Sequence, residues 1–432
     1  MSNLAIIADD LTGANDSGVQ LARHGLQTAV LFDLTSTPIH HYAAIVVDTD
    51  SRSIASAAAY QRVRQMTQQL LSAQFTTIFK KIDSTMRGNI GAELDALYDV
   101  LQPDFMMIAP SYPQNERIVK QSVHYVANIP LAESAAAQDP KTPVTCSHLP
   151  SLLQQQTSKS IGTITLDDLH LGSQHIATIL NQYNKQNTPY IIIDATNDSH
   201  LQSILTICKK LPYRFVWAGS AGIANHLPDF YNIPAKSIVP NIQHQSRPSL
   251  TIIGSIHQQT RDQLEQLIKQ PNIITIPLTS YKVVADQHTA QQEIANVYDQ
   301  VYEQALKGHD IVIYSTGTPA DVTLARQVGE QSNLSFTETS NKIVEALGNV
   351  GAKLLQTKLF GSFILSGGDT AKQLCKYAQI DGFELIDELE SGVPIGRFIN
   401  SSSQEYVITK SGGFGSNQIL VQAIKTLRGE RY

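Results

Sequence analysis

Residues 4–20 read LAIIADDLTGANDSGVQ and join an apolar run to an acidic turn and then to a helical pattern. Leu4–Ala8 is apolar throughout, as in a strand that is buried on both faces of a sheet. The helical pattern from Asp16 to His24 predicts a helix, with Asn15 or Asp16 as its cap and Gly25 just beyond its end. A buried strand followed by polar residues and a helix predicts the first unit of an α/β fold.

The same alternation continues through the first half of the chain. Helices are expected at Ala55–Leu71 and Ile90–Leu101, where apolar residues recur every three or four positions. Further strands are expected at Thr28–Phe32, Ile45–Val47, Thr77–Ile82, Phe105–Ala109, Ile161–Leu166, Tyr190–Ile193 and Arg214–Trp217. Strands that alternate with helices predict a mostly parallel sheet covered on both faces.

The second half of the chain repeats this pattern. Its expected strands are Leu250–Ile253, Ile273–Ile276, Ile311–Tyr314, Phe363–Leu365 and Tyr406–Ile408, and its expected helices are Gln258–Lys269, Gln291–Leu306 and Lys342–Leu355. We therefore predict an α/β protein of two domains, each a mostly parallel sheet flanked by helices.

A proline-rich stretch separates the two halves. Pro228, Pro234, Pro240 and Pro248 interrupt a segment that has little periodicity of its own. We place the boundary near Gln245, which gives domains of residues 1–245 and 246–432.

The composition of the 432-residue chain disfavours two kinds of partner. The formal net charge of -6 leaves no broad basic field for binding along a nucleic-acid backbone. No apolar run approaches the ~18 residues of a membrane span. The N-terminus also lacks the charged and then apolar segments of a signal peptide. We expect a cytoplasmic protein that binds neither nucleic acid nor a membrane.

Ligands of an open parallel sheet bind outside the carboxyl ends of its strands, so the residues that follow each strand are candidates for a site. In the first half these residues are charged or carry hydroxyls: Asp9, Asp10, Thr12, Asp48, Asp50, Ser51, Arg52, Lys81, Asp83, Ser84, Thr85 and Arg87. Carboxylates accept hydrogen bonds from sugar hydroxyls, and Arg52, Lys81 or Arg87 could neutralise a substrate carboxylate. This set suits a polyhydroxylated acid. The structural alternative is that the first two aspartates cap a turn while Asp83 and Arg87 form an ion pair.

The strand ends of the second half are rich in Gly, Ser and Thr. They are Gly254–Ser255, Ser315–Pro319, Ser366–Ala371 and Thr409–Gly415. Glycine lets the backbone approach a phosphate closely, and a helix N-terminus favours an anion. Asp369 could hold Mg²⁺ directly or through water, and Lys410 could meet a phosphate. A single turn of this kind often only connects a strand to a helix, but four in one domain favour a nucleotide.

Two common nucleotide motifs are missing from the chain. Neither GxxxxGK[ST] nor GxGxxG occurs, which disfavours a Walker-type ATPase and a standard dinucleotide-binding domain. The thirteen histidines include no HExxH and no set spaced for a metal.

Four segments, taken in order, resemble the four-carbon acid sugar kinase family over essentially the whole chain. They are residues 7–14 (IADDLTGA), 80–89 (KKIDSTMRGN), 366–371 (SGGDTA) and 410–415 (KSGGFG). Members of that family use ATP to phosphorylate the terminal hydroxyl of D-threonate, D-erythronate or 3-oxo-tetronates. The resemblance implies that the N-terminal domain holds the sugar acid, that the C-terminal domain holds ATP, and that the active site lies in the cleft between them.

The resemblance also implies roles for individual residues. Substrate would contact Asp9, Arg52, Lys81, Ile82, Asp83 and Ser84, and the nucleotide would contact Ser255, Gly367, Gly368, Asp369, Thr370 and Gly412. Residues 13–20 (GANDSGVQ) are similar to the D-threonate branch, whereas the 3-oxo-tetronate branch tends to have Thr in place of Asn15. One position departs from the family pattern, because Glu116 stands where a Gly is expected before Arg117.

The resulting hypothesis is in-line transfer of the γ-phosphoryl group of ATP to the C4 hydroxyl of D-threonate, with D-erythronate and 3-oxo-tetronate as alternatives. Such a transfer asks the protein mainly to position the hydroxyl and to neutralise phosphate charge. Asp83 and Asp10 are the two candidates for accepting the hydroxyl proton. The rivals are a non-catalytic sensor of the same ligands and a dehydrogenase acting on the same acids. A homodimer is a further expectation.

Overall fold

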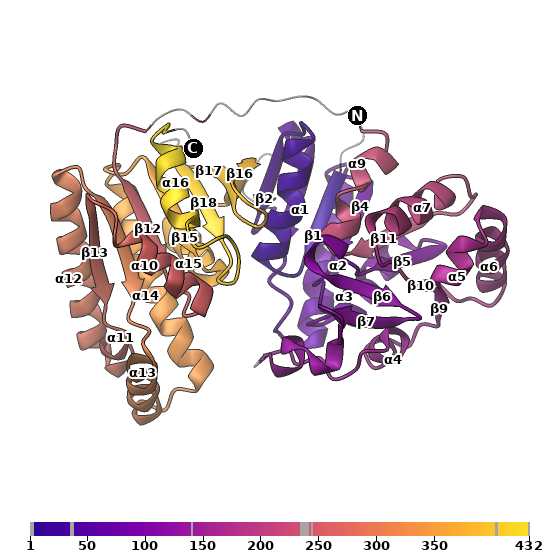
Figure 1. Cartoon of the computed structure of the whole chain (residues 1–432), viewed down its shortest axis with the longest axis horizontal. Helices are drawn as coiled ribbons and strands as arrows, with labels where there is room; N and C mark the ends of the chain where they lie inside the picture. Colours follow the sequence, from indigo (N-terminus) through magenta and orange to yellow (C-terminus); the bar gives the residue numbers. More distant parts are fainter. Residues whose placement is uncertain are drawn as a thin grey trace. The chain divides into compact units, whose positions relative to one another are not determined.

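The chain forms two compact units in a computed structural model, Met1–Ile238 and Val239–Tyr432. The structure describes residues 4–34, 39–139, 141–233, 242, 245–401 and 405–430. Both units are α/β, which confirms the predicted fold class (Figure 1). Pro234 and Pro240 of the predicted linker lie outside the described residues, and the boundary near Gln245 stays a prediction.

The sheet of the first unit is parallel at each strand pair that the structure describes. Its strand order is β2 (Thr28–Leu31), β3 (Ala44–Asp48), β1 (Leu4–Ala8), β4 (Thr77–Lys81), β11 (Phe215–Gly219), β5 (Phe105–Ala109), β10 (Tyr190–Ile193) and β9 (Ile161–Ile164). All residues of β1 are fully buried, as its apolar sequence predicts. Because β1 lies between β3 and β4, the chain changes direction across the sheet at this point. Ligand crevices of parallel sheets form at such a switch point.

Some helices of the first unit begin at a residue whose side chain caps them, whereas others have no side-chain cap among the described residues. The main helices are α1 (Leu11–Arg23), α2 (Ser56–Ser72), α3 (Ile90–Leu101), α6 (Ser173–Lys185) and α7 (Asp198–Cys208), and the shorter ones are α4 (Leu149–Gln154), α5 (Leu166–His170), α8 (Ala221–Ala224) and α9 (Leu227–Phe230). The expected start of the first helix at Asp16 was wrong. Asp10 is its N-cap and accepts a hydrogen bond from the Gly13 N–H at 2.8 Å, so the helix begins directly after the acidic turn.

A small antiparallel sheet in the first unit was not predicted. It consists of β6 (Arg117–Lys120), β7 (Val123–Val126) and β8 (Ile129–Pro130), and none of these strands exceeds four residues. Strands this short do not show a clear alternation of apolar and polar positions. The Val119 N–H donates to the Ala195 carbonyl, which fastens this small sheet to the turn after β10.

The second unit also has a mostly parallel sheet. Its strand order is β13 (Ile273–Leu278), β14 (Asp310–Ser315), β12 (Ser249–Ile253), β15 (Ser362–Ser366), β18 (Tyr406–Lys410), β17 (Pro394–Ile399) and β16 (Gly382–Glu388). The first five are parallel, and β17 pairs antiparallel with both of its neighbours. The switch point lies between β12 and β15. The next two strands of the chain, β13 and β14, lie on one side of β12, and the strands that follow them lie on the other side.

Helices flank this second sheet (Figure 1). They are α10 (Gln258–Leu267), α11 (Ser280–Ala285), α12 (Gln287–Leu306), α13 (Pro319–Gln331), α14 (Phe336–Gln356), α15 (Gly368–Ala378) and α16 (Ile419–Leu427). Helix α15 starts directly after β15, and its first residues belong to the predicted nucleotide turn.

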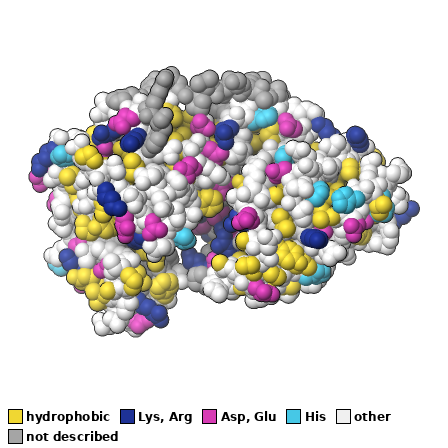
Figure 2. Space-filling view, in the orientation of Figure 1, with side chains coloured by type: hydrophobic (Ala, Val, Ile, Leu, Met, Phe, Trp, Pro, Cys, Tyr) yellow, Lys and Arg dark blue, Asp and Glu magenta, His cyan; other side chains and the backbone are white. Residues whose placement is uncertain are grey.

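Charges of both signs are interspersed on the face that Figure 2 displays. Among the described helices, none is both long enough and apolar enough to cross a bilayer.

Candidate active site

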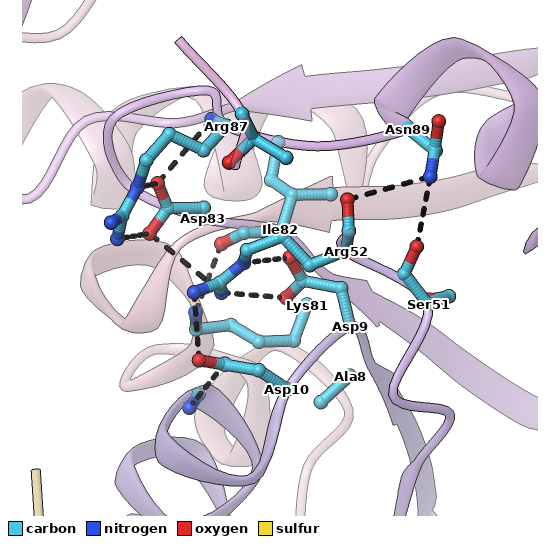
Figure 3. Close-up of polar contacts among 12 residues, drawn as sticks. Ala8, Asp9, Asp10, Ser51, Arg52, Lys81, Ile82, Asp83, Arg87 and Asn89 are labelled. Carbon is cyan, nitrogen blue, oxygen red and sulfur yellow. Dashed lines mark hydrogen bonds and ion pairs between the residues drawn. The ribbon is translucent and has the colours of Figure 1, made fainter. Parts of the chain in front are cut away.

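The ends of β1, β3 and β4 bring three of the predicted acidic residues around one arginine (Figure 3). Arg52 donates from Nε to Asp9 Oδ2 at 2.6 Å and from Nη2 to Asp9 Oδ1 at 3.1 Å. Its Nη1 lies 2.7 Å from Asp10 Oδ2, and its Nη2 lies 3.8 Å from Asp83 Oδ1. The guanidinium of Arg52 is therefore surrounded by carboxylates of the protein.

Arg87 is engaged in the same way. Its Nε and Nη2 donate to Asp83 at 2.7 and 3.1 Å, and its Nη1 donates to Asp139 Oδ2 at 3.0 Å. The Asp83–Arg87 ion pair that the structural alternative predicted is thus present. Contact between Arg87 and substrate stays a prediction. Asp139 also accepts hydrogen bonds from the N–H groups of Lys141 and Thr142, so it fastens the loop that follows it. Sequence reasoning missed Asp139, because it lies in a stretch without motif or periodicity.

The arginines keep the neighbouring carboxylates ionised. Burial alone would raise the pKa of Asp9, but the charge and hydrogen bonds of Arg52, together with the charges of Lys80 and Lys81, outweigh burial and hold that pKa below its ordinary value. Burial would also raise the pKa of Asp83, yet Arg52 and Arg87 hold it well below its usual range. A carboxylate with such a low pKa is a weak proton acceptor.

Lys81 is a buried cation whose ammonium forms no ion pair with a carboxylate of the described residues. Among the described residues, the acceptor for its Nζ is the carbonyl oxygen of Ile82, at 2.9 Å. A Cβ at Gly13 would lie 2.8 Å from that Nζ, so glycine leaves the space that the lysine occupies. The remaining N–H groups of Lys81 could donate to a ligand.

Lys80 has a structural role that separates it from its neighbour. Its Nζ lies 2.7 Å from Glu93 Oε2, and both side chains are fully buried. The Ser51 hydroxyl donates to the other Glu93 oxygen at 2.7 Å, which links the pair to the loop that carries Arg52. Adjacent strand residues point to opposite faces of a sheet, so Lys80 and Lys81 enter different surroundings.

Two further predicted substrate residues lie in the turn after β4. Ile82 is buried, and its N–H donates to the Gly219 carbonyl at 2.9 Å. Ser84 is partly exposed and lies beside Asp83. The predicted substrate residues of this unit are thus gathered at one switch point.

His124 was not singled out from the sequence. It is fully buried in β7, and neither ring nitrogen has a hydrogen-bond partner among the described residues. Burial lowers its pKa to about 4, although the charge of Asp83 opposes this shift.

The nearby Arg117 follows Glu116, whose φ of 57° is left-handed. A left-handed conformation favours glycine, which explains why the family pattern has Gly at the position of Glu116.

In the second unit, the predicted nucleotide residues also lie together. A Cβ at Gly254 would lie 2.3 Å from Thr370 Oγ1, and a Cβ at Gly412 would lie 2.3 Å from Ser255 Oγ. Gly367 has a φ of 115°, which a side chain would strain. The ends of β12, β15 and β18 therefore approach one another as closely as glycine allows.

The ends of β15 and β18 also gather groups that could bind a phosphate. Lys410 is buried, and its Nζ donates to Ser411 O at 2.9 Å, Thr260 Oγ1 at 3.2 Å and Ser366 Oγ at 3.4 Å. Burial lowers its pKa to about 8. Gly368, Asp369 and Thr370 form the first turn of α15, where backbone N–H groups point outward. The described residues contain no cluster of three metal-ligating side chains.

Fold and site together place the chain among two-domain α/β enzymes, with charged side chains gathered at the switch point of one sheet and with glycines and a buried lysine gathered at that of the other. Family models agree with this division. Residues 4–227 match a sugar-binding N-terminal domain, and residues 250–420 match a nucleotide-binding C-terminal domain.

Individual relatives match over nearly the whole chain. A D-threonate kinase of Salmonella typhimurium is 29% identical, covering 98% of this chain and 97% of that protein. A D-erythronate kinase of Heliobacterium modesticaldum is 30% identical, covering 96% and 95%. A 3-oxo-tetronate kinase of Pseudomonas savastanoi pv. phaseolicola is 26% identical, covering 99% and 97%. A solved structure from Salmonella typhimurium LT2 shares the fold, with a TM-score of 0.83 at 23% identity over 99% and 100% of the two chains.

The chain belongs to the four-carbon acid sugar kinase family. The family is one of phosphotransferases, so the predicted class of enzyme is confirmed, and the non-catalytic sensor and the dehydrogenase are disfavoured.

Proposed function

We propose that the chain transfers the γ-phosphoryl group of ATP to the C4 hydroxyl of a four-carbon sugar acid, with D-threonate as the first candidate. The observation that carries this proposal is the division of chemistry between the two switch points. One gathers carboxylates and cations, and the other gathers glycines, a buried lysine and a helix N-terminus. The names of the relatives support a four-carbon acid.

In this proposal Lys81 neutralises the carboxylate of the substrate. Arg52 and Arg87 already donate to protein carboxylates, whereas the ammonium of Lys81 meets only a carbonyl oxygen among the described residues. Asp9 and Asp10 would accept hydrogen bonds from the hydroxyls of the acid. Arg52, Ile82, Asp83, Ser84 and Arg87 would complete the substrate site.

The phosphates of ATP would bind at the first turn of α15. The N–H groups of this turn, which have no partner within the helix, and the partial positive charge of a helix N-terminus favour phosphate oxygens. Lys410 would add a full positive charge, and Ser255 and Gly412 would border the phosphates.

Mg²⁺ would be held by Asp369, directly or through water. This donor set fits the ion, because Mg²⁺ is commonly bound through one or two carboxylates, substrate phosphates and water. When bound, Mg²⁺ would neutralise part of the phosphate charge.

Asp10 is the better proton acceptor of the two candidates. Asp83 receives hydrogen bonds from Thr85 and Arg87 and has a strongly lowered pKa. Asp10 receives one hydrogen bond from Gly13 and pairs with Arg52, and its side chain is more exposed, at 23% against 10% for Asp83. Asp83 would instead hold the two arginines in place.

The test is a coupled assay of ADP formation with Mg²⁺ present, run over D-threonate, D-erythronate and 3-oxo-tetronates. We expect ADP formation to depend on the acid, and D-threonate to give the highest kcat/KM. A preference for D-erythronate or a 3-oxo-tetronate would move the assignment to that acid. If no acid of this panel stimulates ADP formation, the substrate class is wrong.

A further inference from the structure

Two polar side chains of the small antiparallel sheet lie outside the set of predicted site residues. Arg117 of β6 and His124 of β7 share one face of that sheet, because Arg117 pairs with Val126 and His124 pairs with Val119. The arginine and the histidine are thus diagonal neighbours. Such neighbours stand about 7–8 Å apart across an antiparallel pair, which a long side chain can span.

The β6–β7 hairpin that carries this pair is fastened at the carboxyl ends of β5 and β10. Tyr112, which follows β5, exchanges two backbone hydrogen bonds with Arg117, and the Val119 N–H donates to the carbonyl of Ala195, which follows β10. Two N–H groups of the hairpin turn donate to Asp194 at 2.6 and 2.9 Å. Because the sheet is parallel, these carboxyl ends lie at the same edge as the predicted substrate residues.

Arg117 keeps N–H donors that no acceptor of the described residues occupies. Its Nη1 donates to the Asn115 carbonyl at 2.9 Å, and no described carboxylate forms an ion pair with it. Its Nε is buried without an acceptor, whereas its Nη2, which also has no acceptor among the described residues, is not buried. Arg52 and Arg87 differ, because both donate to carboxylates of the protein. Arg117 therefore has a positive charge and an accessible donor for a ligand anion.

His124 can provide the acceptor that the Nε–H of Arg117 lacks. Both ring nitrogens of His124 are buried and have no partner among the described residues, so bulk water does not satisfy them. The pKa of about 4 leaves the ring neutral at pH 7, with a lone pair on one nitrogen. The ring also lies close enough to Asp83 for the charge of that carboxylate to act on it. Two buried groups without partners, one a donor and one an acceptor, thus stand on one face beside the predicted substrate residues.

We propose that Arg117 binds the carboxylate of the sugar acid, and that His124 is the positioning residue that orients the guanidinium by accepting from its Nε. This rests on the proposed function only in taking a sugar acid as the ligand of the first unit. The planar fork of arginine matches the two oxygens of a carboxylate. A carboxylate has about four acceptor sites, so it can accept from Lys81 and Arg117 together.

The test is calorimetric titration of D-threonate, D-erythronate and 3-oxo-tetronate into the full chain without ATP. Arg117→Met should weaken binding of the preferred acid about tenfold or more. The amide of the same acid keeps the hydroxyl groups but has no charge, so its affinity should stay the same in Arg117→Met. Lys120→Met is the matched control, because Lys120 is an exposed cation of the same strand on the opposite face. This control should change neither affinity.

Two variants test the positioning role of His124. His124→Leu removes the acceptor and should weaken binding of the acid about fivefold, with the amide unchanged. His124→Gln restores an acceptor oxygen and should recover most of that loss, which a role in packing alone does not explain. In the kinase assay, Arg117→Met should raise the KM for the acid and keep kcat within about twofold of the parent. Melting temperatures within a few degrees of the parent show that the variants are folded.

Parent affinity for the acid in a folded Arg117→Met would overturn the proposal, as would equal losses for acid and amide, or a lowered kcat with an unchanged KM. Parent affinity in His124→Leu, or no recovery in a folded His124→Gln, would remove the role of His124. Acid binding that depends on Arg117 in a chain without turnover would remove the proposed reaction alone. Turnover with an unchanged KM in Arg117→Met would remove this inference alone, and if none of the three acids binds the parent chain, both are wrong.

Discussion

Asp10 and Asp83 both lie beside Arg52 but differ in what occupies their oxygens. Asp83 is held by Arg87 and Thr85, while Asp10 combines a helix cap with one ion pair. The motifs predicted that both residues belong to the site. The motifs could not show which carboxylate has its oxygens occupied by hydrogen-bond donors of the protein, because Arg87 could equally have pointed to substrate.

Replacing these two carboxylates should have different consequences. Asp10→Asn keeps the acceptor for the Gly13 N–H, so we expect near-native stability but a kcat lowered about 100-fold, as for loss of a general base. Asp83→Asn leaves two arginines short of a buried partner, so it should lower the melting temperature and raise the KM for the acid. Steady-state kinetics and thermal melts of both variants check this. The roles are reversed if Asp10→Asn keeps most of its kcat and a stable Asp83→Asn loses it.

Lys410 predicts a pH dependence of nucleotide binding. Burial lowers its pKa to about 8, so the free protein loses this positive charge as pH rises through 8. Phosphate groups are already fully ionised there, because their second pKa is about 6. ADP affinity should therefore fall about tenfold between pH 7 and pH 9, since protonation of Lys410 favours binding. Calorimetry over this range measures the effect, and Lys410→Met should bind ADP more weakly with a flat profile. A wild-type profile that is equally flat would contradict the role of Lys410.

At the scale of elements, the buried pair Lys80–Glu93 joins β4, which leads into the predicted substrate residues, to α3. The sequence motif contains Lys80, but nothing in it marks Glu93 as its partner. A lysine beside Lys81 in a polar motif looks like a ligand residue. Only the pleat of β4, together with the packing of α3, places it in the core.

Breaking this pair should destabilise the first unit. Lys80→Met leaves the Glu93 carboxylate buried and unpaired, so the free energy of unfolding should fall by about 3–5 kcal/mol. Lys80→Met with Glu93→Leu should recover most of that loss, because neither charge remains. Lys159→Met is the control, since its ion pair with Asp99 is partly exposed and should contribute less than about 1 kcal/mol.

Urea unfolding followed through Trp217 measures these changes. This tryptophan is the only one in the chain, and it is buried in β11 of the first unit. If the double variant is as unstable as Lys80→Met, loss of packing rather than an unpaired charge explains the effect.

Buried apolar runs predicted the central strands well, as in β1 and β5, whose bounds agree with the expected ranges. Helix starts were predicted less well where a side chain caps the helix, as Asp10 does for α1. Likewise, the strand expected at Ile161–Leu166 ends at Ile164, because Thr165 and Asp168 form a capping box that starts α5. Caps depend on side-chain geometry that apolar periodicity does not report.

At the scale of the whole molecule, the alternation of strands and helices predicted two α/β units, each with a mostly parallel sheet. Strand order could not be predicted, because several orders satisfy the same apolar pattern. It is this order that places β1 and β12 at switch points and so gathers residues far apart in the sequence. The homodimer and the position of the active site between the domains stay predictions.

The most direct test of the account is to identify the product formed from ATP and D-threonate. Mass spectrometry and ³¹P NMR should show one added phosphoryl group, with the phosphorus coupled to the two protons on C4. Release of inorganic phosphate with unmodified acid, or phosphate attached to the carboxyl group, would contradict the account.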